Sequence, residues 1–381
     1  MADRVVDWLS LLHEQFPPED AAAWDKVGLQ VGDPHDPVER VLVCLDVTEA
    51  VLDEARRIGA SLVLAHHPLL LRGLERLTPD TAPGRLALRA ARQGLSVVAA
   101  HTNFDAAEVA TTTPIVELLG LERVRPLDGR LDAGGQIVKL TTFVPSEHTS
   151  PVIAALSDAG AGVIGEYAEC TFRVAGTGTF APSDAANPAV GERGQRNEVS
   201  EDRLEVEVRR DRLAAAVAAL WDAHPYEEVA YDVYELVDDR TPVKGLGRVG
   251  DLPAEMSLRV VADRLAQGLP SPHLRVAGDL DRPVRRVAAC GGAGDSLIGE
   301  AISAGADVYV TGDLRHHPVI DARTMGLSLI DAGHDATEAA ALEGLRATLV
   351  AEAGARGLSA QLELSAVPST IWADYRPPGA P

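Results

Sequence analysis

The stretch RVLVCLDVTEAVLDEARRIGASLVLAHHP, residues 40–68, decides the fold. Apolar runs at 40–47 and 61–68 predict two strands, and the segment between them predicts a helix. The pattern continues with an expected helix over 82–95 and an expected strand over 96–105. Strands that alternate with helices are typical of βαβ units, so the class is α/β with a mostly parallel sheet.

The last third of the chain repeats this order of elements. RIGASLVLA aligns with ISAGADVYVT around a shared Gly-Ala, and GLSVVAAHTNFDAAE aligns with GLSLIDAGHDATE around Gly-Leu-Ser. We therefore expect two related α/β halves, residues 1–128 and 242–381, which together form one core.

The middle of the chain, residues 129–241, has a different pattern. Its expected elements follow the order βαββαβ, which is the ferredoxin-like, split-βαβ arrangement of an α+β domain. A polar segment rich in turn-forming residues, 181–200, separates the second and third expected strands. The sequence thus predicts a small domain inserted between the two halves.

Composition limits the possible function. The formal net charge is −22, which argues against direct binding to nucleic acid or to an anionic membrane, because both need a basic surface. No apolar stretch is long enough to cross a bilayer, and the N-terminus reads as an amphipathic helix, not as a signal peptide. The three cysteines are far apart and form no CxxC pair, so a reducing cytoplasm is expected.

Residues that commonly bind metals follow the expected strands. In open α/β sheets, ligands bind beyond the carboxyl ends of the strands. Four such ends carry imidazole or carboxylate groups: His66 and His67; His101, Asn103 and Asp105; Asp313, His316 and His317; His334 and Glu338.

The adjacent pair His66 and His67 needs an explanation, because neighbouring side chains of a strand point to opposite faces. One histidine in the core and one in solvent would satisfy that rule. However, Pro68 turns the chain, so both rings can face one site and serve two neighbouring metals. His334 and Glu338 are four residues apart and share one face of a helix, although DATE also reads as a helix-capping box.

The inventory of His66, His67, Asp105, His334 and Glu338 suits a dinuclear centre with Glu338 as the bridge. Nitrogen and oxygen ligands suit zinc first, and also manganese, iron, cobalt or nickel. Such a pair of ions acidifies a bridging water. We expect His101 and Asp46 to act in proton transfer or to support the ligands, with Asn103, Asp313 and His316 as further candidates. Strand alignment places His316 and His317 later than the first pair, so they are expected to line the site.

The chain resembles the Nif-three-like dinuclear-metal-centre family, also called GTP cyclohydrolase 1 type 2 homologues, in its long form. The motifs that carry the resemblance span nearly the whole chain: WDKVGLQVGDP (24–34), HHP (66–68), HTNFDAA (101–107), HPYEEVAYD (224–232), GDLRHHP (312–318) and DAGHDATE (331–338).

The resemblance implies the same five ligands, two divalent metal ions per chain and a metal-dependent hydrolase acting on a nucleotide-like small molecule. It implies that His67 and Asp105 hold one metal, that His66 and His334 hold the other, and that Glu338 bridges them. It also implies a toroidal homohexamer with a small-molecule ligand in its internal cavity. A non-catalytic metal-binding or regulatory scaffold is the alternative.

Overall fold

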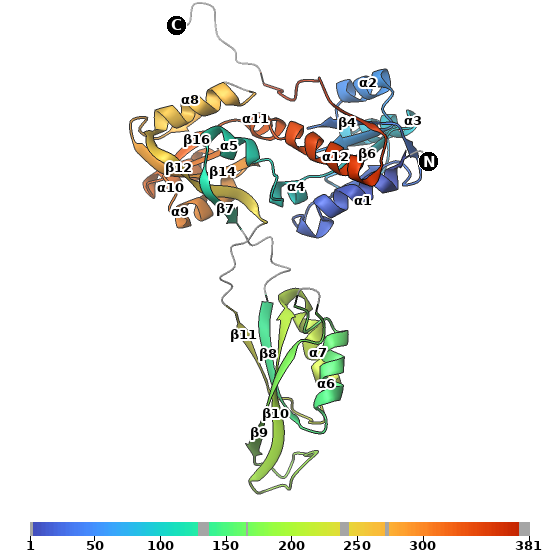
Figure 1. Cartoon of the computed structure of the whole chain (residues 1–381), viewed down its shortest axis with the longest axis vertical. Helices are drawn as coiled ribbons and strands as arrows, with labels where there is room; N and C mark the ends of the chain where they lie inside the picture. The colour runs from blue at the N-terminus through green and yellow to red at the C-terminus, as the bar shows by residue number, and fades with distance from the viewer. Residues whose placement is uncertain (1–2, 129–136, 165–166, 237–243, 271–273, 373–381) are drawn as a thin grey trace, which may run out of the picture. The chain divides into compact units, whose positions relative to one another are not determined.

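The computed structural model divides the chain into two compact units, residues 1–131 with 241–381 and residues 132–240. Figure 1 shows the course of the chain. The structure describes these residues: 3–128, 137–164, 167–236, 244–270 and 274–372.

The first unit contains a five-stranded sheet in which three neighbouring pairs are parallel and one edge pair is antiparallel. Thr48 accepts a hydrogen bond from Val51 N and starts α2, and Gly59 ends that helix in the left-handed conformation. The strands, in spatial order, are β17 (Gln361–Leu364), β4 (Arg40–Cys44), β5 (Leu62–Ala65), β6 (Ser96–Ala99) and β2 (Gly28–Val31). The helices beside it are α1 (Val5–Gln15), α2 (Glu49–Ile58) and α3 (Ala82–Arg92).

A second, six-stranded sheet belongs to the same unit. Only β14–β15 and β15–β16 are parallel, and the other three pairs are antiparallel. The prediction of one mostly parallel sheet is therefore wrong, because each half has its own sheet and long antiparallel strands extend the second. In spatial order the strands are β13 (Arg275–Ala277), β16 (Ser328–Asp331), β15 (Val308–Gly312), β14 (Pro283–Ala293), β12 (Leu246–Ser257) and β7 (Glu122–Asp128).

The two halves exchange segments. The strand β7 and the helix α5 (Thr113–Leu119) come from the first half of the sequence but pack in the second, where Leu119 shares a core with Val261 of α8 (Leu258–Gly268). Conversely, α12 (Leu342–Arg356) and β17 return to the first sheet, where Leu345 shares a core with Trp8. Figure 1 shows the red α12 beside the blue α1.

Four further short helices belong to this unit, and two short strands pair near its N-terminus. The helices are α4 (Thr102–Ala106), α9 (Ile298–Ser303), α10 (His316–Thr324) and α11 (His334–Ala339), and the strands are β1 (Asp3–Arg4) and β3 (Pro37–Val38).

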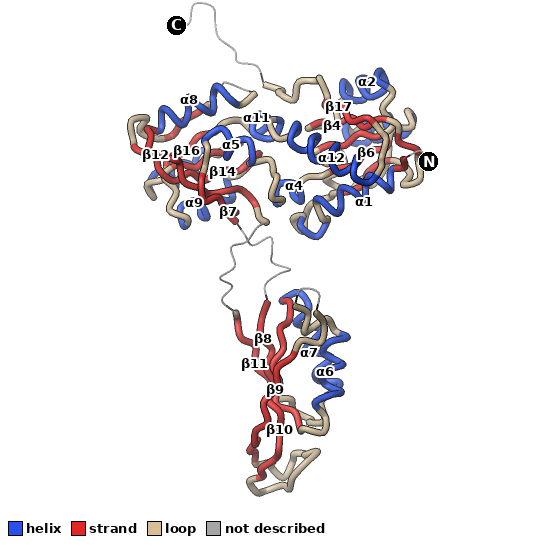
Figure 2. The backbone as a smooth tube through the Cα atoms, viewed as in Figure 1, coloured by secondary structure: helices blue, strands red, loops and turns tan. Residues whose placement is uncertain are grey.

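The second unit has the predicted element order βαββαβ and one antiparallel sheet with the strand order β11-β8-β10-β9. Leu140 and Leu204 of the sheet pack against Leu156 and Leu220 of the two helices, which lie on the same face of the sheet (Figure 2). Its elements are β8 (Ile137–Pro145), α6 (Thr149–Asp158), β9 (Thr171–Phe180), β10 (Asn197–Arg209), α7 (Leu213–Ala223) and β11 (Tyr231–Glu235).

Over the described residues, no helix combines the length and the apolar character that crossing a bilayer requires.

Candidate metal centre

His66 lies directly beyond β5, where the strand has ended and the chain turns toward Pro68. Its backbone N–H still donates to the carbonyl of Cys44, and that of His67 donates to the carbonyl of Leu45. The His66 side chain is fully buried, and its Nδ1 lies 2.9 Å from the carbonyl oxygen of Ala100. Because a carbonyl only accepts, Nδ1 of His66 carries the proton and Nε2 carries a lone pair.

His67 and His334 are oriented in the same way by carboxylates. Nδ1 of His67 donates to Asp46 over 2.8 Å, and Nδ1 of His334 donates to Asp313 over 2.8 Å. Asp313 has a positive φ of 54°, which places it in the left-handed region directly after β15. Such hydrogen bonds fix the ring orientation of metal-binding histidines and leave Nε2 to the metal.

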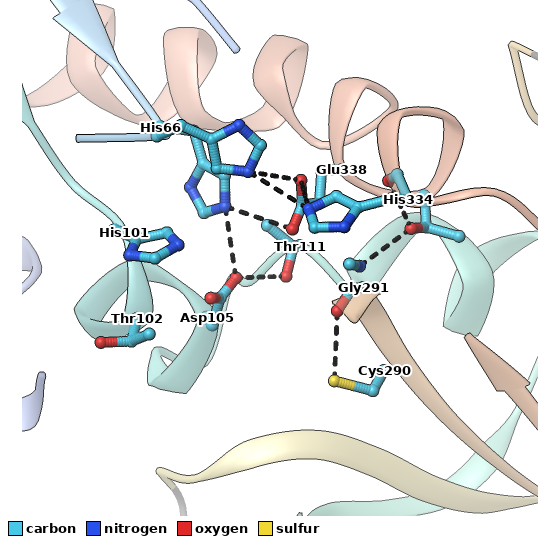
Figure 3. Close-up of polar contacts among 12 residues, drawn as sticks. His66, His101, Thr102, Asp105, Thr111, Cys290, Gly291, His334 and Glu338 are labelled. Atoms are coloured by element: carbon cyan, nitrogen blue, oxygen red, sulfur yellow. Dashed lines mark hydrogen bonds and ion pairs between the residues drawn. The ribbon is translucent and has the colours of Figure 1, made fainter. Parts of the chain in front are cut away.

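The Nε2 atoms of all three histidines face Glu338, whose side chain is almost fully buried. Nε2 of His66 lies 3.5 Å from Oε1 of Glu338 and 3.7 Å from Oδ1 of Asp105. Nε2 of His67 and Nε2 of His334 lie 2.9 Å and 3.1 Å from Oε2 of Glu338. Figure 3 shows His66, Asp105, His334 and Glu338 pointing toward one centre.

This arrangement sets lone pairs against carboxylate oxygens. Nε2 of His66 and Oε2 of Glu338 are both buried, and while the three rings are neutral neither atom has a hydrogen-bond donor among the described residues. Acceptors facing acceptors in a buried site repel one another unless a cation lies between them. The donor set of imidazole nitrogens and carboxylate oxygens therefore fits divalent metal ions.

The electrostatics of the ligands agree with a site for positive charge. Burial opposes protonation of His67, but hydrogen bonds to Asp46 and Glu338 outweigh it and raise its pKa to about 10. The hydrogen bond to Glu338 is the main cause that raises the pKa of His334 to about 9. Burial opposes ionisation of Glu338 too, yet the surrounding histidines hold its pKa well below the ordinary range.

The distances group the ligands differently from the pairing that the family resemblance implies. One group contains His66, Asp105 and Oε1 of Glu338, and the other contains His67, His334 and Oε2 of Glu338. Nε2 of His67 and Nε2 of His334 lie 3.3 Å apart, close enough for one ion to bind both. Asp105 also accepts a hydrogen bond from Thr111 over 2.6 Å, which fixes its carboxylate.

His101 lies beside the centre and has a carboxylate behind it. Its Nδ1 donates to Asp25 over 2.8 Å, so Nε2 is left free. The ligand atoms of His66, His67 and His101 lie within 4.8 Å of one another, so Nε2 of His101 lies next to the predicted ligands. Burial favours the neutral acid of Asp25, but hydrogen bonds from His101 and Thr102 hold its pKa well below the ordinary range.

Comparison with known proteins identifies the family. A family model described as Duf34/NIF3 (NGG1p interacting factor 3) matches residues 4–368. The chain belongs to the Duf34/NIF3 family. This confirms the resemblance that the six sequence motifs indicated.

Curated relatives named "GTP cyclohydrolase 1 type 2 homolog" match most of this Duf34/NIF3 chain. The Mycobacterium leprae protein is 42% identical over 341 residues, which are 89% of this chain and 88% of the relative. The Bacillus subtilis protein is 42% identical over 85% of this chain and 86% of its own length. Among solved structures, a Bacillus cereus protein related to NIF3 is 37% identical, with a TM-score of 0.67 and coverage of 98% of this chain and 100% of its own.

Five of the six motifs of the Duf34/NIF3 resemblance contribute to the site. The sixth lies in the second unit, where Nε2 of His224 contacts the carbonyl of Phe143 at 3.0 Å in a structural role. Asn103 is also structural, because its Oδ1 accepts from His101 N and its Nδ2 donates to the carbonyl of Phe16. His316 and His317 start α10 and are exposed, and no contact among the described residues joins them to the five predicted ligands.

Three contributors to the site were not predicted from the sequence. Asp25 and Thr111 fix His101 and Asp105. The motif at 24–34 was the available signal for Asp25, whereas Thr111 lies in no quoted motif and carries no signal of its role. Gly292 has a φ of +68°, and a Cβ on it would collide with Oε1 of Glu338. The Gly-Gly of the CGG segment was the available signal, since paired glycines at a strand end indicate close approach of another group.

Proposed function

We propose that this protein is a metal-dependent hydrolase whose dinuclear centre acts on a nucleotide-like small molecule. One observation carries the proposal: three imidazole Nε2 atoms and two carboxylates converge on one point, where the neutral rings leave only acceptor atoms facing one another. The name shared by the curated relatives, "GTP cyclohydrolase 1 type 2 homolog", supports a purine nucleotide as the substrate class.

The ligands would bind two divalent ions per chain. Glu338 offers one oxygen to each ligand group and is the natural bridge. Nitrogen and oxygen donors suit zinc best, and iron, manganese, cobalt and nickel are the other candidates. Divalent ions supply Lewis acidity, which lowers the pKa of water and polarises a substrate oxygen.

The surrounding residues have distinct roles in this proposal. Asp46 and Asp313 orient His67 and His334 by accepting their Nδ1 protons. His101 accepts or delivers a proton at Nε2, because Asp25 holds its Nδ1 proton. Asp46 is half-exposed and is therefore assigned to orientation alone.

The proposal extends to assembly and location. The chain would form a toroidal homohexamer in the cytoplasm, with the metal centres facing an internal cavity that admits the small molecule. The second unit would be the ferredoxin-like domain of the long family form, since its βαββαβ order and its β11-β8-β10-β9 strand order fit that arrangement. The net charge of −22 fits a protein that binds neither nucleic acid nor membrane.

Metal analysis tests the centre first. Protein purified without an affinity tag should contain two divalent ions per chain, and Glu338→Gln should retain one or none, because the bridge loses its charge. His316→Ala is the matched control: it removes an exposed histidine of the second HHP segment and should retain both ions. Far fewer than two ions in the wild type would reject the dinuclear centre.

Turnover tests the hydrolase. The metal-loaded protein should hydrolyse at least one member of a panel of nucleotides and phosphoesters, and His66→Ala should lose that activity while His316→Ala keeps it. Two bound ions without turnover on any substrate would instead support a non-catalytic metal-binding or regulatory scaffold.

A further inference from the structure

The second unit contains a pocket of about 700 Å³ on the face of its sheet that α6 and α7 do not cover. Small-molecule sites typically have volumes of ~300–1,000 Å³. The pocket lies over β9 and β10, and residues from the loop 181–196 and from the segment 226–230 complete its walls. The backbone N–H of Asn187 donates to Glu227 over 2.7 Å, which ties these two walls together.

A buried carboxylate lies in this pocket. Glu201 of β10 is only 8% exposed, and its Oε1 accepts a hydrogen bond from the Tyr226 hydroxyl over 2.7 Å. No basic side chain of the described residues forms an ion pair with Glu201. Burial, followed by the neighbouring carboxylate, raises the pKa of the Tyr226 hydroxyl above its ordinary value, so that hydroxyl remains a donor to Glu201.

Two glycines of β9 make room for this carboxylate. Gly176 and Gly178 face the pocket, and a Cβ on Gly178 would collide with the carboxylate of Glu201. A Cβ on Gly176 would find its nearest neighbour at 3.9 Å, so this glycine leaves open space on the pocket floor. Gly178 accommodates the carboxylate of Glu201, and Gly176 leaves bare floor beside it, so that a ligand can approach the backbone of β9 and the side chain of Glu201.

The rest of the lining combines aromatic rings with negative charge. The rings of Phe180 and Tyr226 lie with their centroids 6.2 Å apart, and Phe143 contributes a third ring. Two more carboxylates, those of Glu227 and Glu228, line the pocket. Arg203 also lines the pocket, and its guanidinium Nε lies 3.0 Å from Oε1 of Glu205.

We propose that this pocket binds a small organic cation, namely a protonated amine attached to an apolar body. Aromatic faces attract cations through their negative π-electron density, and a buried, unpaired carboxylate forms a charge-assisted hydrogen bond with an ammonium group. The apolar walls take the hydrocarbon part of the same molecule. The site is separate from the metal centre, since every residue of its lining belongs to the second unit.

Three probes with the same phenyl-alkyl body and different charge test this proposal on the full-length protein. They are phenethylamine, 2-phenylethanol and 3-phenylpropanoate, and calorimetry or ligand-observed NMR measures their binding. Phenethylamine should bind about tenfold tighter than the alcohol, and the propanoate should bind weakest, because charge decides recognition in a desolvated site. Equal affinities, a preference for the anion, or no binding of the amine would overturn the proposal.

Variants locate the binding site. Glu201→Gln keeps an acceptor for Tyr226 but removes the charge, so the amine should lose about tenfold in affinity while the alcohol is unaffected. Gly176→Val should remove binding of both, because its side chain fills the floor. Glu198→Gln, an exposed carboxylate of the same strand outside the pocket, should change nothing.

Two further readouts check that the variants fold and that the amine binds in this pocket. Unchanged far-UV circular dichroism and an unchanged melting transition of the second unit in Glu201→Gln and Gly176→Val would show that these variants fold. Loss of amine binding in His66→Ala would place the amine at the metal centre and overturn the proposal. A change of oligomer size in Gly176→Val would show that a second copy of the chain occupies the pocket, which would also overturn it.

Discussion

Nε2 of His67 lies 3.3 Å from Nε2 of His334, although 267 positions separate the two residues in the sequence. Both rings donate their Nδ1 protons to carboxylates, so the two facing nitrogens have no proton of their own in the neutral state. Two lone pairs at this distance repel each other. A shared cation, either a proton or a metal ion, removes that repulsion.

Metal binding should therefore release protons. The pKa values of His67 and His334, raised to about 10 and about 9, keep both rings protonated near pH 7 when metal is absent. A metal binds only the neutral ring. Zinc must displace the protons from both rings, and fewer rings are protonated at higher pH. The affinity for zinc should therefore increase as the pH rises toward 9 and decrease as the pH falls.

Calorimetry of zinc binding in two buffers of different ionisation enthalpy measures the number of protons released. If zinc binding released almost no protons at pH 7, the result would contradict the close approach of the His67 and His334 rings. The variant His35→Ala, which alters an exposed turn, should release the same number as the wild type.

Gly292→Ala should weaken metal binding without removing any ligand. The new Cβ would collide with Oε1 of Glu338, and the φ of +68° is strained for alanine. We expect a loss of about tenfold or more in zinc affinity, similar to losses from disturbed supporting residues. Competition with a chelator of known affinity measures it.

Gly299→Ala is the matched control for that substitution. Gly299 lies in α9, and no atom lies within 4 Å of the position that a Cβ would take. The Gly299→Ala protein should therefore keep the zinc affinity of the wild type. Its free energy of unfolding should stay equal or increase by up to about 1 kcal/mol. Equal zinc affinities for both glycine variants would contradict the close approach of Glu338 to Gly292.

Asp25→Ala should destabilise the first unit. The carboxylate is buried and accepts hydrogen bonds from His101 Nδ1 and from both N and Oγ1 of Thr102. Leaving these buried donors without an acceptor costs about 2–4 kcal/mol, which calorimetric melting detects as a lower Tm. The substitution Glu19→Ala at an exposed position nearby should not change the Tm. An unchanged Tm for Asp25→Ala would contradict the buried network.

Asp251 should contribute a pH-dependent part of the stability. Hydrogen bonds from Arg286 and then from Arg123 lower its pKa to about 2. Because the folded-state pKa lies below the unfolded value of about 3.9, the contribution is complete above pH 4 and is lost as the pH falls toward 2. Since both arginines are largely exposed, its size is on the order of 1 kcal/mol.

Melting of Asp251→Asn and wild type across this range tests the assignment. The Tm difference should be constant at neutral pH and should narrow below pH 4. Asp281→Asn, whose carboxylate is highly exposed beside Arg259, should show no such narrowing. If the Tm difference between wild type and Asp251→Asn grew as the pH fell, the pH dependence would be opposite to the expected one and Asp251 would not have this role.

Local patterns of the sequence predicted the helices and strands of each half, because apolar runs and their spacing act within one βαβ unit. The number of sheets was not predictable from these patterns. The halves exchange β7 and β17, and apolar strands of this kind carry no information on which sheet they join. Repeated sequence motifs predicted two halves but not their exchange of segments.

The convergence of His66, Asp105, His334 and Glu338 could be expected because metal-binding residues follow the strand ends of both halves, and pairing two related halves brings those ends toward one another. The sequence could not predict how these ligands group around the two oxygens of Glu338, because that grouping depends on the orientation of the imidazole rings. That orientation comes from Ala100, Asp46 and Asp313, and a backbone carbonyl such as that of Ala100 has no signature in the sequence.

The return of β17 to the first sheet has a consequence for biosynthesis. Gln361 pairs with Arg40, so the β4 edge has no partner strand until nearly the whole chain has left the ribosome. Until then β4 is an open edge to which other nascent chains can add. His66 and His67 are synthesised early, but the centre they belong to becomes complete only when Glu338 arrives and α12 closes over α1.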